Sequence, residues 1–148
     1  MREKTIQNQD ISLARKTLLE TKCSVVVIKK GNVLTKKHGQ GIKPLLETIE
    51  ELGKKMEGTT VGDRILGKAS AMLCIYSKVA SVYSTMATKK AIAALIQAKI
   101  PGQTDKIIPY IKNKNGKDIC PFEKMLQDIH SPEEAYKILK KHFVSKRT

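Results

Sequence analysis

The order of hydrophobic patterns at the start of the chain restricts its fold more than any other feature. Residues 10–22 place apolar side chains at helical spacing, which predicts an amphipathic helix. Residues 24–37 then change to β-branched and apolar residues on both sides of a Gly31-Asn32 turn signal, which predicts an antiparallel hairpin. Few folds begin with a helix that is followed directly by such a hairpin.

The rest of the chain predicts helices that alternate with strands. Asp63 is a favourable N-cap for a helix that is apolar nearly all round, so we expect this helix to be buried at the centre of the fold. Pro109 lacks a backbone donor, which predicts that its strand lies at a sheet edge or carries a bulge. We expect helices over residues 44–57, 63–78, 88–100, 121–129 and 131–143, and strands over residues 79–84 and 107–111.

This order of elements predicts the fold class. A strand, a helix and a second strand of these lengths imply a right-handed parallel crossover. These elements and the hairpin together predict an α/β fold with three layers, α/β/α, in which a mixed sheet carries helices on both faces. We expect a single domain over residues 1–148, with a core at about residues 10–143 and frayed ends.

The composition is that of an ordinary globular domain, with 148 residues of which 41% are hydrophobic. The first ten residues lack the apolar core of a signal peptide, and no later run approaches the ~18 apolar residues of a membrane span, so we expect a cytoplasmic protein without membrane contact. Cys23, Cys74 and Cys120 form no CxxC pair, which argues against a disulfide scaffold and a zinc knuckle and predicts reduced thiols. We expect Cys23 and Cys74 to be inert core residues.

Positive charge is concentrated in the second half of the chain. The net charge is +14, and residues 64–117 hold ten Lys or Arg but only one acid, Asp105. Such a field attracts nucleotides, nucleic acid, acidic proteins or anionic metabolites, although a lysine-rich surface also serves solubility alone. With no Trp, four Tyr and two Phe, the chain has little material for base stacking, so the aromatic residues do not support nucleic-acid binding.

Three stretches of the chain resemble a known family. They are residues 63–73 (DRILGKASAML), residues 79–84 (VASVYS) and Cys120-Pro121-Phe122-Glu123. Over about residues 13–143 the chain is similar to a family of small prokaryotic proteins classed as a domain of unknown function. The resemblance implies a cytidine-deaminase-like fold, and it leaves the activity open.

The implied fold can be tested for zinc chemistry. Zinc deaminases carry an H-x-E or C-x-E motif on the central helix and P-C-x-x-C at the start of the next helix. At the corresponding places this chain reads Lys68-Ala69-Ser70 and, over residues 87–91, ATKKA, which contain no ordinary zinc ligand. We therefore expect no metal site, no cofactor and no zinc-dependent deamination. The three histidines are isolated in the sequence and do not supply a ligand set: His38, His130 and His142.

The residues at these places suggest an anion site instead. Lysine ammonium groups, hydroxyls and the N-terminal N–H groups of helices are equipment for binding a phosphate or a nucleotide-like molecule. The candidate residues are Lys68, Ser70, Thr88, Lys89 and Lys90. The alternative is that the lysines reach solvent while the serine and the threonine are small or capping residues.

A second hypothesis is thiol chemistry at Cys120. Pro121 and Glu123 are typical of the first turn of a helix, so Cys120 falls at the N-cap, where the helix dipole favours a thiolate. Lys114 and Lys117 would add to this effect. Glu123 would either cap the helix or accept a proton.

A third hypothesis is a non-enzymatic interaction module. The strand edge near Pro109 and one helix face would then pair with a second copy of the chain or with another protein. The sequence leaves these three hypotheses open.

Overall fold

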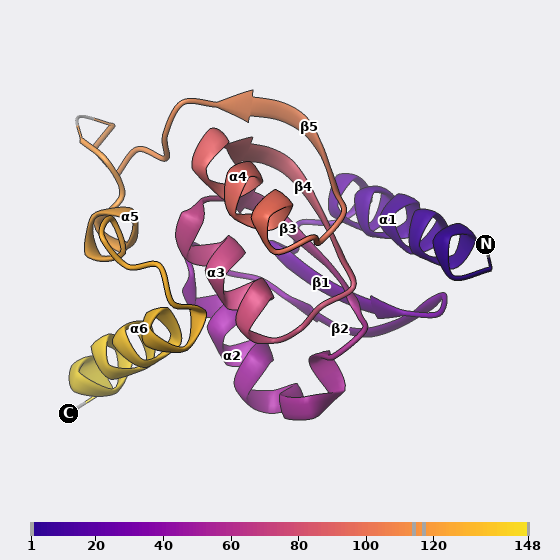
Figure 1. Ribbon diagram of the computed structural model, residues 1–148, viewed down its shortest axis with the longest axis horizontal. Helices are drawn as coiled ribbons and strands as arrows, with labels where there is room; N and C mark the ends of the chain where they lie inside the picture. The colour runs from indigo at the N-terminus through magenta and orange to yellow at the C-terminus, as the bar shows by residue number, and fades with distance from the viewer. Residues whose placement is uncertain (1, 114, 117, 148) are drawn as a thin grey trace.

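Five strands form one mixed sheet at the centre of the computed structural model, which describes residues 2–113, 115–116 and 118–147 (Figure 1). The strands are β1 (Val25–Lys29), β2 (Asn32–Lys37), β3 (Thr60–Leu66), β4 (Ser81–Thr88) and β5 (Gly102–Ile108). Their order across the sheet is β2-β1-β3-β4-β5. β1 is antiparallel to β2 and to β3, whereas β3, β4 and β5 run parallel to one another.

Helices cover both faces of this sheet. α1 (Arg2–Glu20) packs on one face against β1, β3 and β4. On the other face α3 (Lys68–Tyr76) contacts α4 (Lys89–Gln97) and α6 (Pro132–Arg147). This layer also contains α2 (Lys43–Leu52), the 3-10 helix η1 (Gly53–Met56) and the short helix α5 (Pro121–Met125). The predicted α/β class with a mixed sheet is confirmed. No helix in the described part of the chain is long and apolar enough to cross a membrane.

Strand β1 is buried on both faces because each face is covered. Val25 and Val27 belong to the larger core cluster, between the sheet and the layer of α2, α3 and α4. Val26 and Ile28 belong to the smaller cluster, under α1. A strand that separates two cores reads as a continuous apolar run, as residues 25–28 do.

The predicted hairpin over residues 24–37 is confirmed as β1 and β2, but its two-residue turn is Lys30-Gly31 rather than the predicted Gly31-Asn32, since Asn32 already pairs with Lys29. Both turn residues have positive φ angles, 48° and 81°, as the twist of a two-residue hairpin loop requires. The backbone N–H groups of Lys30 and Gly31 donate to the carboxylate of Asp10 at 3.0 and 2.9 Å. Because Asp10 lies on α1, the hairpin turn is tied directly to the opening helix.

The prediction of a helix over residues 63–78 that starts at Asp63 was wrong. Residues 60–66 form β3, and the helix begins only at Lys68. β3 lies between β1 and β4 at the centre of the sheet, so it is buried on both faces and lacks the alternation that identifies a half-buried strand. Its apolar residues therefore merged with those of α3 into one helical pattern. Gly67, in extended conformation with φ −101° and ψ −174°, separates the two elements.

Other element boundaries also differ from the prediction. β4 continues to Thr88 rather than ending at residue 84, and β5 ends at Ile108 rather than spanning residues 107–111. The last parallel strand is an edge strand as predicted, and Pro109 follows it directly. α5 ends at Met125 rather than at residue 129, α6 extends to Arg147, and α1 begins at Arg2 rather than at residue 10.

Two residues of β3 hold α1 against the sheet. Gly62 has no side chain, and a Cβ there would lie 2.8 Å from Val26 Cγ1 and 3.1 Å from the Cβ of Ala14. Arg64 directs Nη2 at the carbonyl oxygens of Leu18 and Cys23, at 2.8 and 2.5 Å. These carbonyls lie at and just beyond the C-terminus of α1, where backbone acceptors lack helical partners. β3 thus determines how closely α1 approaches the sheet, and it supplies the donor for carbonyl groups at the C-terminus of α1.

We expect Gly62→Ala to lower the free energy of unfolding by roughly 1–3 kcal/mol, because the added methyl group overpacks the smaller core. Chemical denaturation measures this change. Val26→Ala introduced together with Gly62→Ala removes the nearest obstructing methyl groups, so the two substitutions should couple favourably in a double-mutant cycle. Strictly additive effects would contradict the close approach at Gly62.

Candidate functional site

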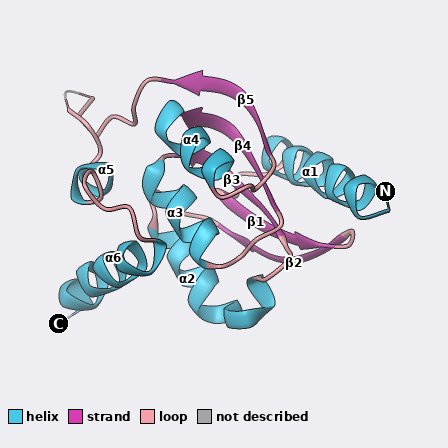
Figure 2. Cartoon of the chain, in the orientation of Figure 1, coloured by secondary structure: helices cyan, strands magenta, loops and turns pink. Residues whose placement is uncertain are grey.

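The candidate site lies where two parallel strands end and two helices begin. β3 ends at Leu66 and is followed by α3, and β4 ends at Thr88 and is followed by α4. In parallel strands that are connected in this way, both helix N-termini lie at the same edge of the sheet, where α/β proteins bind ligands. Figure 2 shows the arrowheads of β4 and β5 pointing to the side on which α5 lies. α5 and the segments beside it therefore cover this edge.

Glu123 of α5 caps the N-terminus of α3. Its two carboxylate oxygens accept hydrogen bonds from the backbone N–H groups of Lys68 and Ala69, at 2.8 and 2.9 Å. A Cβ at Gly67 would collide with this carboxylate and with Ile111, so glycine leaves the room that the contact needs. A carboxylate is stabilised at this place because the free N–H groups and the helix dipole both favour negative charge.

This capping role differs from both roles that the sequence suggested for Glu123. The sequence predicted either a cap for the residue's own helix or a proton acceptor for Cys120. The contact instead crosses 54 and 55 residues to Ala69 and Lys68, and it engages both carboxylate oxygens. The pattern Cys120-Pro121-Phe122-Glu123 is therefore explained by the docking of α5 onto α3.

A cavity of about 230 Å³ adjoins this contact, and we call it the anion cavity. The residues that line it come from three separate segments of the chain. Those used below are Lys68, Thr88, Lys90, Tyr110, Glu123, Lys124 and Gln127. The sequence analysis singled out seven candidate site residues in all. Four of them line this cavity, although 55 positions separate the first from the last: Lys68, Thr88, Lys90 and Glu123.

The polar groups of the anion cavity differ in how they are engaged. The Thr88 hydroxyl accepts a hydrogen bond from Ala91 N at 3.1 Å, the predicted capping of α4. Lys68 Nζ donates to the carbonyl oxygen of Gln127 at 3.1 Å, and Lys124 pairs with Asp118. The ammonium group of Lys90 has no hydrogen bond or ion pair among the described residues. Lys90 is therefore the cation most available to a ligand.

Two of the five predicted anion-site residues do not line the anion cavity. Lys89 is exposed beside Lys90, and Ser70 is buried on the inner side of α3. The Ser70 hydroxyl faces the carboxyl group of Asp63 on β3 and forms a hydrogen bond with it. Ser70 therefore supports a buried acid below the site rather than the cavity itself.

Asp63 is an unusual acid because it is buried, with only 7% of its surface exposed. Burial raises the pKa of Asp63 to about 7, against the lowering effect of hydrogen bonds from Ser70 and from the backbone N–H groups of Ile65 and Arg64. Burial is also the main cause that raises the pKa of the nearby Cys74 thiol, and the negative charge of Asp63 adds to it. Sequence reasoning assigned Asp63 to a helix cap and so missed this role.

Three further polar residues of the anion cavity were not predicted. Tyr110 and Lys124 lie on the segment that follows β5 and on α5, and Gln127 follows α5. No local motif marks them, because only the docking of Glu123 onto α3 brings this part of the chain to the cavity. The exposed aromatic Tyr110 directly after Pro109 is the one sequence feature that could have indicated them.

Cys120 lies apart from the anion cavity, since it is not among the lining residues. Its thiol is free and partly buried, and it makes no capping hydrogen bond to α5. α5 is only five residues long, so few peptide dipoles are aligned to stabilise a thiolate. Lys114 and Lys117, the predicted charge partners, lie outside the described residues. Cys23 and Cys74 are buried and free, as predicted.

The residue types at the helix starts do not fit zinc. Residues 60–66 form a strand, so a strand separates α2 from α3 and the start of α2 must also be compared with the deaminase motifs. The three helix starts to compare are residues 41–44, 67–70 and 88–91. They read GIKP, GKAS and TKKA and hold no cysteine, histidine or carboxylate. Within the residues that the structure describes, no group of three or more His, Cys, Asp or Glu side chains could hold a metal ion.

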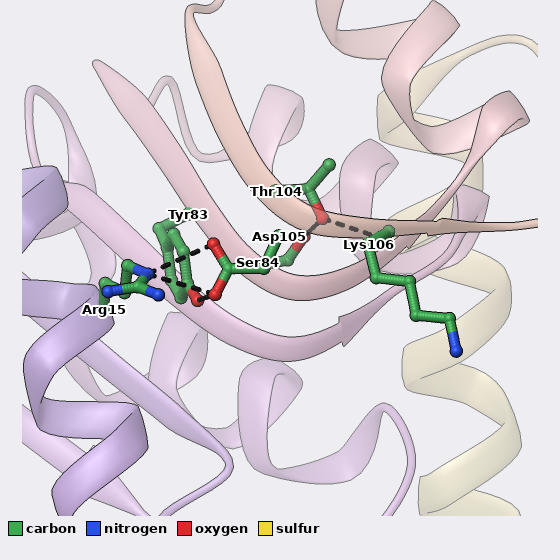
Figure 3. A network of polar contacts seen from close by, with 6 residues as sticks. All are labelled: Arg15, Tyr83, Ser84, Thr104, Asp105 and Lys106. Carbon is green, nitrogen blue, oxygen red and sulfur yellow. Dashed lines mark hydrogen bonds and ion pairs between the residues drawn. The ribbon is translucent and has the colours of Figure 1, made fainter.

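A second polar cluster lies on the opposite face of the sheet (Figure 3). Arg15 of α1 donates through Nε to both carboxylate oxygens of Asp105 on β5, at 3.1 and 3.0 Å, and the Tyr83 hydroxyl donates to the same carboxylate at 2.8 Å. Partial burial acts to raise the pKa of Asp105, but the hydrogen bonds from Tyr83 and Arg15 outweigh it and hold the pKa below its ordinary value. This cluster ties α1 to the edge strand and has a structural role.

The fold and the site define a class of protein: an α/β domain with a mixed five-stranded sheet whose helix starts lack zinc ligands. The chain belongs to the family known as domain of unknown function DUF1893, whose sequence profile matches residues 13–143. The resemblance that the sequence suggested is thereby confirmed.

A solved structure from the same family agrees with this assignment. A DUF1893 family protein from Thermotoga maritima is 25% identical and superposes with a TM-score of 0.83 over 90% of each chain. RibD from Acinetobacter baumannii is 18% identical, with a TM-score of 0.47 over 70% of this chain and 35% of RibD. The dCMP deaminase from cyanophage S-TIM5 is 13% identical, with a TM-score of 0.47 over 68% of this chain and 97% of the deaminase. These last two similarities are too distant to bear on activity. No curated protein matches the chain.

The buried acid predicts how stability depends on pH. The native pKa of Asp63 is about 7 and its ordinary value is 3.8, so between these limits the native state holds a proton that the unfolded state has lost. The free energy of unfolding should therefore fall as pH rises from about 4 to 7. Asp63→Asn should remove this fall and stabilise the protein at pH 8 by roughly 1–3 kcal/mol. Denaturant titrations at pH 4 and pH 8 test it, and parallel pH profiles for the two proteins would refute the assignment.

The capping contact predicts a local effect of Glu123→Gln. A neutral amide interacts less favourably with the α3 N-terminus, so we expect a loss of roughly 0.5–2 kcal/mol in stability. Hydrogen exchange should show reduced protection at the amides of Lys68 and Ala69. Glu50→Gln removes the same charge from an exposed position on α2 and serves as the control. Equal protection in the two variants would show that the carboxylate does not stabilise α3.

Proposed function

We propose that this protein binds a small phosphorylated anion in the anion cavity. The observation that carries the proposal is the convergence of three lysines, Lys68, Lys90 and Lys124, on one space at the carboxyl ends of parallel strands. Lysine ammonium groups bind phosphate as point charges, and such a site lies where α/β folds place their ligands.

The charges around the cavity support the proposal. Three lysines line it against one carboxylate, that of Glu123, and this carboxylate is already engaged by two backbone N–H groups. Lys124 is neutralised in part by Asp118, whereas Lys90 is unpaired among the described residues. A phosphate would thus gain an ion pair with Lys90 without having to displace an existing one. The Tyr110 hydroxyl adds a neutral donor on the same wall.

The role of Glu123 restricts how the anion binds. The N-terminus of α3, which is the usual helix site for a phosphate, is filled by the protein's own carboxylate. The proposed ligand therefore contacts lysine side chains rather than the backbone of α3. This arrangement favours binding through charge, which weakens as salt concentration rises.

The other hypotheses have less support. Thiol chemistry at Cys120 loses its predicted proton acceptor, because Glu123 is committed to α3. An interaction module through the edge strand β5, and nucleic-acid binding by the basic half of the chain, stay predictions from the sequence.

Calorimetric titration with inorganic pyrophosphate at low ionic strength tests the proposal. We expect Lys90→Ala to raise Kd about tenfold or more, because a charge-assisted hydrogen bond contributes roughly 1.5–3 kcal/mol. Lys89→Ala removes the same charge one residue away, outside the cavity lining, and should leave Kd nearly unchanged. Equal affinities of the two variants, or no binding by the unmodified protein, would contradict the site.

A further inference from the structure

We propose that the ligand is an organic phosphate ester whose apolar body lies in a second cavity between α3 and α4. This inference rests on the proposed function, since it extends the ligand beyond the anion cavity. The second cavity has a volume of about 530 Å³, within the range of small-molecule sites, and we call it the body cavity. It shares Lys68, Lys90 and Gln127 with the anion cavity. A phosphate group held by the two lysines is therefore adjacent to the larger space.

The two helices that form the body cavity carry matching stripes of residues. On α3 the lining residues are Lys68, Met72 and Ile75, spaced by four and three positions so that they fall on one helical face. On α4 the stripe begins at Lys90 and continues through Ala93 and Ala94 to Gln97 and Ala98. Each stripe thus has a cation at the helix start and apolar residues further along.

Small side chains on α4 create the space. Ala93, Ala94 and Ala98 occupy positions where larger apolar residues would fill the gap to α3. The apolar residues of α4 that do have bulk point elsewhere: Leu95 is buried in the core, and Ile96 is 69% exposed outside the lining. The groove is therefore a consequence of residue size at three positions of one helix.

The polar residues of the body cavity lie around its apolar part. Gln97 on α4 and Gln127 after α5 present amide groups, and His130 presents an imidazole before α6. An inorganic anion would use none of the apolar lining. The common chemistry that fits both cavities is a phosphate or diphosphate joined to an apolar body, which can be a flat heterocycle or an aliphatic chain.

Three probes with the same anionic head separate the possibilities: inorganic pyrophosphate, ADP and geranyl diphosphate. We expect at least one of the two esters to bind about tenfold more tightly than pyrophosphate, since a factor of ten corresponds to burial of roughly 60 Å² of apolar ligand surface. Tighter binding of ADP assigns a heterocyclic body, and tighter binding of geranyl diphosphate assigns an aliphatic one.

Ala94→Leu tests the location of the body, because leucine is a strong helix former that fills the groove. The variant should lose the added affinity for the ester and keep the pyrophosphate affinity, which also shows that it folds. Ile96→Phe adds bulk to the same helix outside the lining and should change neither.

The outcomes distinguish the two proposals. Pyrophosphate binding with no added affinity for either ester, or an ester preference that survives Ala94→Leu, would overturn the inference and leave the anion site standing. Absence of binding by all three probes would overturn both.

Discussion

The contact between Glu123 and the N-terminus of α3 determines the geometry of the candidate site. It joins a carboxylate to two backbone N–H groups at 2.8 and 2.9 Å across more than fifty residues of chain. α5 is short, and beside this charged contact Phe122 packs against the larger core while Leu126, directly after the helix, is fully buried in it. Charged and apolar contacts together therefore hold the segment after β5 in place. That segment supplies Tyr110, Lys124 and Gln127 to the anion cavity. The outer wall of the site therefore depends on how α5 docks onto α3 and the core.

The two faces of the sheet differ in how tightly they are packed. Under α1 the contacts are close and fully used: Gly62 allows the helix to approach, Arg64 satisfies its last carbonyls, and Arg15 joins it to Asp105 on the edge strand. On the other face the helices leave two cavities open at the carboxyl ends of β3 and β4. The second face also holds the larger hydrophobic core, so it combines stability with unfilled space and an unpaired lysine.

A feature could be predicted from the sequence when the residues that form it are close together in the chain. The hairpin, the crossover and the capping of α4 by Thr88 depend on neighbouring residues, and they were predicted together with the α/β class. β3 was missed because a central strand that is buried on both faces has no alternation, so its apolar residues merged with those of α3. In the site, Lys68 and Lys90 were singled out by comparison with the deaminase motif positions, with Lys68 placed inside a predicted helix. The structure shows both at helix starts after parallel strands, which meet at one edge. Tyr110, Lys124 and Gln127 could not be predicted, because a contact distant in sequence brings them there.

The apolar run of β1 has a consequence for folding. Residues 25–28 read Val-Val-Val-Ile, so a shift of one residue would still place valine or isoleucine in each of the two cores. Hydrophobic pattern normally opposes such a shift, because it would expose apolar residues and bury polar ones, and here that opposition is almost absent. The pairing with β2 and β3 must then be selected by something that distinguishes neighbouring residues. Asp10 does so, since its two carboxylate oxygens fit the N–H groups of Lys30 and Gly31 in one alignment only.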